Sequence, residues 1–185
     1  LLQGSRNGTK LGHTELTDGL VKDGLWDVYN DFHMGTAAEI CARDGNYDRT
    51  AQDAFAAESY RRALEAQNGG LFDAEITPEK APPRRGDALW VTVDEEPARG
   101  RPDKMAKLRP AFDREGTITA ANASSINDGA AVLVLTSVAY AEKNGLKVLA
   151  RMTDSVQHAQ EPEWFTTAPA YAIQKLFERN QLTAT

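Results

Sequence analysis

Residues 116–135 read GTITAANASSINDGAAVLVL, and this stretch places a run of small residues directly before a strongly apolar segment. The segment 130–137, AAVLVLTS, is almost continuously apolar, which is typical of a β-strand covered on both faces. The small residues before it have two explanations. Alanine and glycine permit a tight turn, and they also allow a ligand to come close to the backbone.

The chain after this stretch alternates between strand patterns and helix patterns. Alternation of this kind is typical of an α/β layer, so the sequence predicts the α/β fold class. Serine and threonine at helix starts, glycine at a helix end and proline in a first turn mark the helix boundaries. The predicted strands cover 130–137 and 146–159, and the predicted helices cover 137–145, with Ser137 as N-cap and Gly145 as stop, and 166–180, with Thr167 as N-cap.

The first 114 residues contain two further predicted helices among irregular segments. Residues 8–20, GTKLGHTELTDGL, predict a loop or short hairpin. From 71 to 114 prolines limit long helices, and ALWVTVDEE at 88–96 predicts one strand. The helices cover 35–43, which ends before Gly45, and 49–67, which begins at the N-cap Asp48 and ends at NGG.

Composition and charge exclude several classes of protein. The chain has 185 residues, of which 41% are hydrophobic, enough for a core. No apolar run approaches the roughly 20 residues of a membrane-spanning helix, which predicts no membrane partner. A net charge of −6 argues against a nucleic-acid partner.

The charge is unevenly distributed along the chain. Residues 97–114 hold six basic side chains and two acidic ones, a local net charge of +4 that leaves −10 for the rest. A basic patch on an acidic chain suits a small anionic ligand, although a solvated surface is the other interpretation. The basic residues are Arg99, Arg101, Lys104, Lys107, Arg109 and Arg114.

The single cysteine and the scattered histidines offer no catalytic pair by themselves. One cysteine, Cys41, excludes a disulfide framework and a cysteine zinc site. It lies in a predicted helix without a neighbouring base, so we interpret it as a small buried residue. His33 precedes a helix start, where a cap, a core position and a functional role all remain open.

Three longer segments carry a resemblance to a known family. Residues 30–63, 105–131 and 161–176 resemble the middle of a thiolase, the acetyl-CoA C-acetyltransferase family, and the resemblance runs essentially from end to end. KLRPAF at 107–112 followed by GTITAANAS and NDGAA carries it most specifically. Together with SY at 59–60, TAANAS is most similar to the eukaryotic mitochondrial, potassium-activated acetoacetyl-CoA thiolases.

The resemblance implies a fold and a domain organisation. A thiolase consists of two similar βαβαβαββ halves, with a long loop domain inserted in the first half. By similarity, residues 1–126 are the coenzyme A-binding loop domain, 127–148 end the N-terminal core half and 149–185 begin the C-terminal core half. The chain begins without Met and both ends are abrupt, so we expect a fragment of a longer protein.

The resemblance also implies a reaction that this chain does not complete. Thiolases condense two acetyl-CoA to acetoacetyl-CoA, or cleave it by thiolysis, through a cysteine acyl-enzyme. The family's nucleophilic cysteine lies upstream of this segment, and its N-E-A-F, G-H-P and C-x-G motifs lie downstream. Because Cys41 and His33 do not match those positions, we predict no catalytic residue here and no activity of the chain alone.

What the resemblance assigns to this chain is recognition of coenzyme A, as substrate and product. The phosphates of coenzyme A would contact basic side chains. Its pantetheine amides would form a hydrogen bond with a hydroxyl group, and its acyl group would lie against a partly aromatic wall. Arg101 stands where a relative carries an acid, which puts its role in doubt. The residues matching coenzyme A or acyl positions are Leu25, His33, Met34, Tyr60, Arg99, Lys104, Ser124, Ile126 and Phe165; Phe165 lies where the family discriminates substrate branching.

A potassium site follows from the similarity to the potassium-activated branch. There a tyrosine of the long helix and carbonyls of the small-residue run hold the ion, and Tyr60, Ala120, Ala121 and Ala123 match those positions. Tyr60 as an ordinary residue of an amphipathic helix remains the alternative. Residues 8–20 match a loop that joins dimers in tetrameric relatives, so we expect a homo-oligomer.

Two alternatives remain open for the function. One is a non-catalytic coenzyme A-binding or interaction module, and the other is a different thiolase-superfamily member, such as a longer-chain or sterol-carrier-type thiolase. A mitochondrial or a cytoplasmic location is compatible with the sequence.

Overall fold

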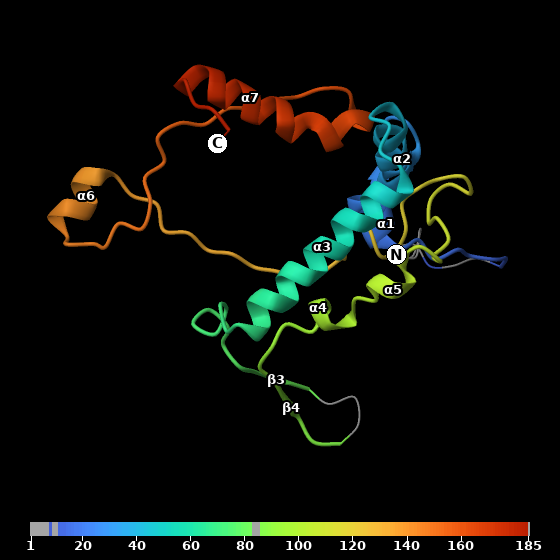
Figure 1. The fold of residues 1–185 in the computed structure, drawn as a ribbon, viewed down its shortest axis with the longest axis horizontal. Coiled ribbons are helices and arrows are strands. Elements are labelled where there is room, and N and C mark those ends of the chain that lie inside the picture. The colour runs from blue at the N-terminus through green and yellow to red at the C-terminus, as the bar shows by residue number, and fades with distance from the viewer. Residues whose placement is uncertain (1–7, 9–10, 83–85, 185) are drawn as a thin grey trace. The chain divides into compact units, whose positions relative to one another are not determined.

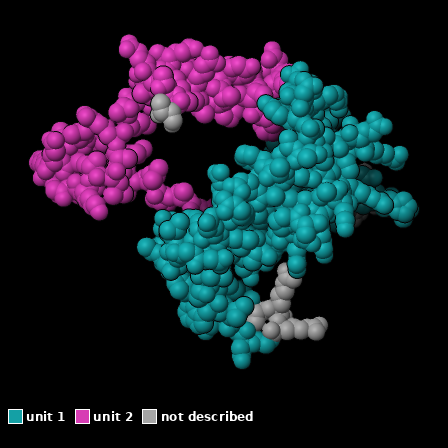
Figure 2. Space-filling view, viewed as in Figure 1, with its two compact units in different colours: residues 1–124 teal, residues 125–185 magenta. Residues whose placement is uncertain are grey.

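The computed structural model describes residue 8, residues 11–82 and residues 86–184 (Figure 1). The chain divides into two compact units, Leu1–Ser124 and Ser125–Thr185 (Figure 2). The division rests on contacts within the chain, and the three domains expected from the resemblance stay a prediction. None of the helices in the described ranges is long and apolar enough to cross a membrane.

The first unit contains one short capped helix and two short antiparallel hairpins. α1 (Gly19–Gly24) starts at Asp18, whose carboxylate accepts hydrogen bonds from the backbone N–H groups of Leu20 and Val21. Strands β1 (Trp26–Asp27) and β2 (Phe32–His33) pair antiparallel, as do β3 (Glu79–Ala81) and β4 (Leu89–Val91). The strand predicted over 88–96 is therefore only three residues long, and its partner β3 was not predicted.

Two helices at the centre of the first unit confirm the sequence prediction. α2 spans Met34–Asp44 with Gly45 as its C-cap, and α3 spans Arg49–Asn68 with Gly69 as its C-cap. The Asp48 carboxylate accepts a hydrogen bond from Ala51 N–H at 2.7 Å, which is the expected N-cap. The short helices α4 (Glu96–Arg99) and α5 (Pro102–Met105) both contact α3 (Figure 1), and they carry two of the six basic residues of 97–114, Arg99 and Lys104.

Most of the buried residues of the first unit belong to α2, to α5 and to the loop that follows residue 116. Met105 is 2% exposed and Thr119 is fully buried. The apolar members of this small core are Ala37, Ala42, Met105 and Ile118, and Glu39 is buried with them. The start of the small-residue loop, with Ile118 and Thr119, is therefore itself buried.

The second unit confirms both predicted helices and both predicted N-cap residues. α6 (Val138–Lys143) begins at Ser137, whose hydroxyl accepts a hydrogen bond from Tyr140 N–H. α7 (Ala168–Asn180) follows a 3-10 helix, η2 (Pro162–Thr167). Thr167 is the N-cap residue of α7, as predicted, but its hydroxyl makes no capping hydrogen bond: it donates to the Trp164 carbonyl and accepts from the Gln160 amide.

The two strands predicted for the second unit do not form among the described residues. Residues 130–137 and 146–159 have no regular strand pairing, and their apolar side chains are open to solvent: Val132 is 90% exposed and Leu149 is 87% exposed. A strand needs a neighbour for its backbone hydrogen bonds. No described residue supplies one to either segment, so the prediction of a covered strand is wrong for the chain as described.

Candidate functional site

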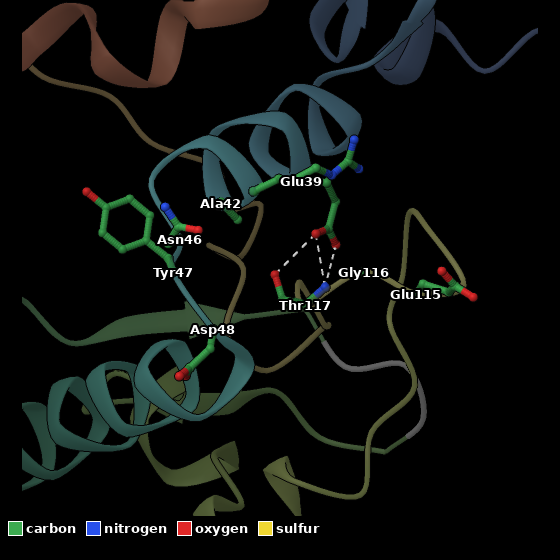
Figure 3. Close-up of a pocket in the computed structure, with 9 residues that line it drawn as sticks. Glu39, Ala42, Asn46, Tyr47, Asp48, Glu115, Gly116 and Thr117 are labelled. Atoms are coloured by element: carbon green, nitrogen blue, oxygen red, sulfur yellow. Dashed lines mark hydrogen bonds between the residues drawn. The ribbon is translucent and has the colours of Figure 1, made fainter.

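A buried carboxylate fixes the start of the small-residue loop. Glu39 of α2 is 4% exposed, and its two carboxylate oxygens accept hydrogen bonds from the N–H groups of Thr117 and Ile118 at 2.8–3.0 Å. The Thr117 hydroxyl lies 3.2 Å from the Glu39 carboxylate and donates to it as well. Figure 3 shows Glu39 reaching from α2 toward Thr117. A buried charge requires such partners, so the side chain and the loop hold each other in place.

The loop then closes on itself through two polar side chains. Thr119 N–H donates to the Asn122 side-chain oxygen at 2.7 Å, and the Asn122 amide donates to the Thr117 carbonyl at 3.0 Å. The Thr119 hydroxyl oxygen accepts longer hydrogen bonds from the N–H groups of Ala121 and Asn122. Asparagine and threonine bond neighbouring backbone in this way in tight turns. The tight-turn explanation therefore holds for residues 117–123.

Helix α3 anchors the same loop from the other side. The Asn122 amide donates to Asp53 Oδ1 at 2.9 Å, and the Gln52 amide donates to the Thr117 hydroxyl at 2.8 Å. Arg49 pairs with Asp53 at 2.8 Å in a partly buried ion pair. Both central helices thus contribute side chains to one loop.

The alanines of the loop leave their carbonyls unbonded. Ala120 is exposed, and Ala121 and Ala123 are half-buried. Their backbone oxygens accept no hydrogen bond from the part of the chain that the structure describes. The second explanation of the small residues, close approach of a ligand to the backbone, is therefore compatible with the turn.

The basic segment is held against α3 by an arginine and a tyrosine. The Arg49 guanidinium donates to the carbonyls of Met105 and Leu108 at 2.5 and 3.2 Å, which ties the end of α5 to the start of α3. The Tyr60 ring lies over Gly100, where an added Cβ would come within 2.5 Å of a ring carbon. Gly100 thus permits a close approach that a larger residue would prevent.

The two predicted phosphate ligands differ in their surroundings. Lys104 is exposed, and its ammonium group has no hydrogen-bond or ion-pair partner among the described side chains. Arg99 is also exposed but pairs with Glu95 at 2.8 Å. Because exposed ion pairs of this kind are weak, the pair leaves the Arg99 guanidinium available to a stronger anion.

His33, Met34 and Leu25 come together where α2 begins. His33 Nδ1 accepts a hydrogen bond from Gly35 N–H at 2.9 Å, so the ring is the N-cap of α2 and, when neutral, carries its proton on Nε2. The ring also stacks on Phe112, with centroids 4.9 Å apart. Met34 N–H donates to the Leu25 carbonyl at 2.8 Å.

The hairpin that precedes His33 is fixed by a buried aspartate. Asp27 is 8% exposed, and its carboxylate accepts hydrogen bonds from the Asn30 side chain at 2.8 Å and from Tyr29 N–H at 2.8 Å. The Asn30 side chain is the main cause that lowers the pKa of Asp27, so this carboxylate stays ionised and keeps the turn closed.

The remaining predicted residues are not gathered into one described group. Ser124 is exposed at the end of the first unit, whereas Ile126 and Phe165, 66% and 41% exposed, belong to the second unit and are described there by themselves. No hydrogen bond between described residues joins Tyr60 to the three alanines. Within the described ranges there is also no group of three or more His, Cys, Asp or Glu side chains placed to hold a metal ion.

A pocket of about 310 Å³ opens beside the Glu39 contact (Figure 3). Its walls come from the end of α2, the start of α3 and residues 115–117, and none of the predicted coenzyme A or potassium residues lines it. The lining residues are Glu39, Ala42, Arg43, Asn46, Tyr47, Asp48, Glu115, Gly116 and Thr117.

The sequence analysis missed the side chains that hold the loop. Glu39 had a usable signal, because it is the one charged residue in the run TAAEICA at 36–42, and a charge on an apolar helix face needs a buried partner. Gln52, Asp53 and Asn122 carried no comparable signal, since polar residues on a long helix and in a loop are usually solvated. Cys41 is half-buried in α2, and none of the contacts described above involves it.

Comparison with known proteins gives consistent matches. Residues 2–139 match the family described as thiolase, N-terminal domain. An acetyl-CoA acetyltransferase of Schizosaccharomyces pombe is 47% identical over 181 residues, which are 97% of this chain and 46% of the relative. The chain thus spans about half the length of the curated relatives it matches.

Two solved structures have the same fold. The Acat5 thiolase from Ascaris suum, a crystal structure in complex with coenzyme A, aligns with a TM-score of 0.87 and 38% identity over 98% of this chain and 46% of that chain. An acetyl-CoA acetyltransferase from Syntrophomonas wolfei aligns with a TM-score of 0.84 and 32% identity over 99% of this chain and 46% of that chain.

Proposed function

The chain belongs to the thiolase family and is a segment of that family's α/β fold, and on this premise we propose that it is the coenzyme A-binding part of an acetyl-CoA C-acetyltransferase. The complete protein would transfer the acetyl group of one acetyl-CoA to a cysteine sulfur, which releases free coenzyme A. The α-carbon of a second acetyl-CoA would then lose a proton and take the acetyl group, which frees the cysteine thiolate. The reverse reaction would cleave acetoacetyl-CoA by thiolysis.

One observation supports this proposal more strongly than any other. A structural neighbour that is 38% identical over 98% of this chain is a thiolase with coenzyme A bound. The similarity extends through the loop at 117–123 and the basic segment, the two features that suit an anionic ligand with a long amide arm. Guanidinium and ammonium groups are the protein groups best suited to phosphates.

The proposed roles divide the ligand into three parts. Arg99 and Lys104 contact its phosphates, and Ser124 donates to or accepts from a pantetheine amide. Leu25 and Ile126 pack along the pantetheine arm. His33, Met34 and Phe165 line the acyl end, where the His33 ring is already oriented by its bond to Gly35 N–H.

The proposal also covers the branch of the thiolase family to which the complete protein would belong. We infer the mitochondrial, potassium-activated branch, in which Tyr60 and the carbonyls of Ala120, Ala121 and Ala123 contribute to a K⁺ site. The unbonded carbonyls suit a hard cation, which prefers oxygen ligands. A homotetramer, a role in lipid metabolism and a mitochondrial or cytoplasmic location belong to the same assignment.

Binding of coenzyme A is expected to depend on the 3′-phosphate. Calorimetric titration of the chain should give one saturable site for coenzyme A, and dephospho-coenzyme A, which lacks that phosphate, should bind about tenfold more weakly, because one charge-assisted hydrogen bond contributes about 1.5–3 kcal/mol. Equal affinity for the two ligands would contradict the role of the basic segment.

Thiolysis is expected to be absent from the chain by itself. The activated cysteine and the base that the reaction needs match no residue of this sequence. The loss of acetoacetyl-CoA in the presence of free coenzyme A, followed by its enolate absorbance, should proceed at the rate of the buffer control. Protein-dependent cleavage would contradict this expectation, and its loss in Cys41→Ser would identify Cys41 as the nucleophile.

A further inference from the structure

A relay of polar side chains fixes the turn that carries Phe165. Gln160 donates from its amide nitrogen to the Thr167 hydroxyl at 2.7 Å and to the Trp164 carbonyl. The Thr167 hydroxyl in turn donates to the same Trp164 carbonyl at 3.0 Å. These bonds span both ends of η2, so one glutamine side chain ties the turn together.

The hydrogen bonds determine which way the Gln160 amide faces. A carbonyl oxygen only accepts, so the Gln160 atom that bonds the Trp164 carbonyl is the nitrogen. The Gln160 oxygen therefore faces His158 Nε2, at 3.0 Å. Since that oxygen also only accepts, the His158 nitrogen opposite it carries the proton.

The surroundings of the His158 ring agree with this tautomer. Its other nitrogen, Nδ1, is buried and has no hydrogen-bond partner among the described residues. The ring stacks on Tyr171 of α7, with centroids 5.0 Å apart and planes inclined by 25°. A buried N–H without an acceptor is costly, so the proton belongs on Nε2, and the ring has a fixed position from which to donate.

We propose that His158 and Gln160 are positioning residues that hold η2, and with it the Phe165 ring, in one place at the acyl end of the substrate site. This inference rests on the proposed function, in which Phe165 lines that end. A fixed aromatic wall distinguishes acyl groups that differ by a branch at the α-carbon, whereas a wall that can move adapts to either one. The relay thus determines the selectivity without touching the substrate.

The tautomer can be tested in the wild-type chain without any ligand. A long-range proton–nitrogen NMR correlation should show His158 with a protonated Nε2 and an unprotonated Nδ1. The spectrum of His158→Gln identifies the signals among those of the three histidines. The opposite tautomer, or rapid averaging of both, would overturn the relay.

The positioning role is tested by comparing the affinities for acetoacetyl-CoA and 2-methylacetoacetyl-CoA. The wild type should distinguish them by about tenfold, the lower end of the effect of one methylene group in a shaped pocket. Gln160→Ala and His158→Phe, which keeps the ring and removes the donor, should lose most of this difference. His158→Gln, which keeps a donor at the Nε2 position, should retain it.

The control is Gln174→Ala on α7, a glutamine whose side-chain amide donates to Glu178 on the exposed helix surface. It should leave the ratio of the two affinities unchanged, and all four variants should bind free coenzyme A as the wild type does. Normal coenzyme A binding with an unchanged ratio in Gln160→Ala overturns the positioning role alone. Absence of coenzyme A binding by the wild type contradicts the proposed function instead.

Discussion

Replacing Glu39 with alanine is expected to lower the free energy of unfolding of the first unit by about 3 kcal/mol. The change leaves the N–H groups of Thr117 and Ile118 without their acceptor, and each unsatisfied buried donor costs about 1–3 kcal/mol. Water that enters the vacated space forms some of the lost hydrogen bonds. The expected loss of stability is therefore smaller than the sum of the costs of the two unsatisfied N–H groups. Glu39→Gln should be intermediate, because an amide offers one acceptor oxygen where the carboxylate offers two.

Urea unfolding followed by circular dichroism measures this effect. Glu65→Ala is the matched control, because Glu65 is also a helical glutamate whose carboxylate accepts a hydrogen bond, in its case from Arg61, but its side chain is 72% exposed. The control should change the stability by less than about 0.5 kcal/mol. A Glu39→Ala variant as stable as that control would mean that the loop at 117–123 does not depend on α2.

The helices could be predicted because their signals are local. Asp48 and Ser137 cap the helices that follow them, and Gly45 ends α2, as the sequence indicates. A cap needs only its own helix turn, so distant parts of the fold do not alter it. Thr167 also stands at its predicted N-cap position, but its hydroxyl oxygen accepts a hydrogen bond from the Gln160 amide and none from its own helix.

The strands could not be predicted in the same way. The apolar pattern of 130–137 indicates that the segment suits burial, but a strand forms only beside another strand, and its neighbours are usually remote in sequence. In the described chain Val132 and Leu133 are 90% and 84% exposed. The hairpin β3–β4 shows the reverse case, where a cross-strand neighbour a few residues away stabilises a segment without a strong pattern of its own.

The sequence alone indicates the small-residue loop and the basic segment, but not the side chains that hold them in place. The motif at 116–131 identifies the loop, and the charge count identifies the basic segment. Which side chains hold them, above all Glu39 and Arg49, depends on contacts between residues more than 50 positions apart in sequence. A single sequence contains no direct record of such pairs.

Removing the two predicted phosphate ligands together should have the largest effect on binding. Arg99→Ala with Lys104→Ala should weaken coenzyme A binding about 100-fold, because each charge-assisted bond to a phosphate contributes about 1.5–3 kcal/mol and both residues are partly solvated. The expected loss of about 100-fold corresponds to the lower end of the summed free energies of the two bonds, because Arg99 gives up its ion pair with Glu95 when it binds a phosphate. The fold should be unaffected, because both side chains are exposed.

The effect of removing two positive charges from the segment has to be distinguished from the loss of two specific phosphate contacts. Lys107→Ala with Arg109→Ala removes the same two charges from the same segment, at exposed positions that match no coenzyme A contact. This control should weaken binding about threefold at most at physiological salt, as expected when the screened attraction of an anion to a basic patch decreases. Higher salt should reduce the small effect of the control pair and leave most of the effect of the first pair.

The most direct test of the account is calorimetric titration of coenzyme A into the wild-type chain and into these two double variants. We expect one saturable site in the wild type, about 100-fold weaker binding after loss of Arg99 and Lys104, and nearly unchanged binding after loss of Lys107 and Arg109. Failure of the wild-type chain to bind coenzyme A, or equal affinity of the two double variants for it, would show that the basic segment is not a coenzyme A site.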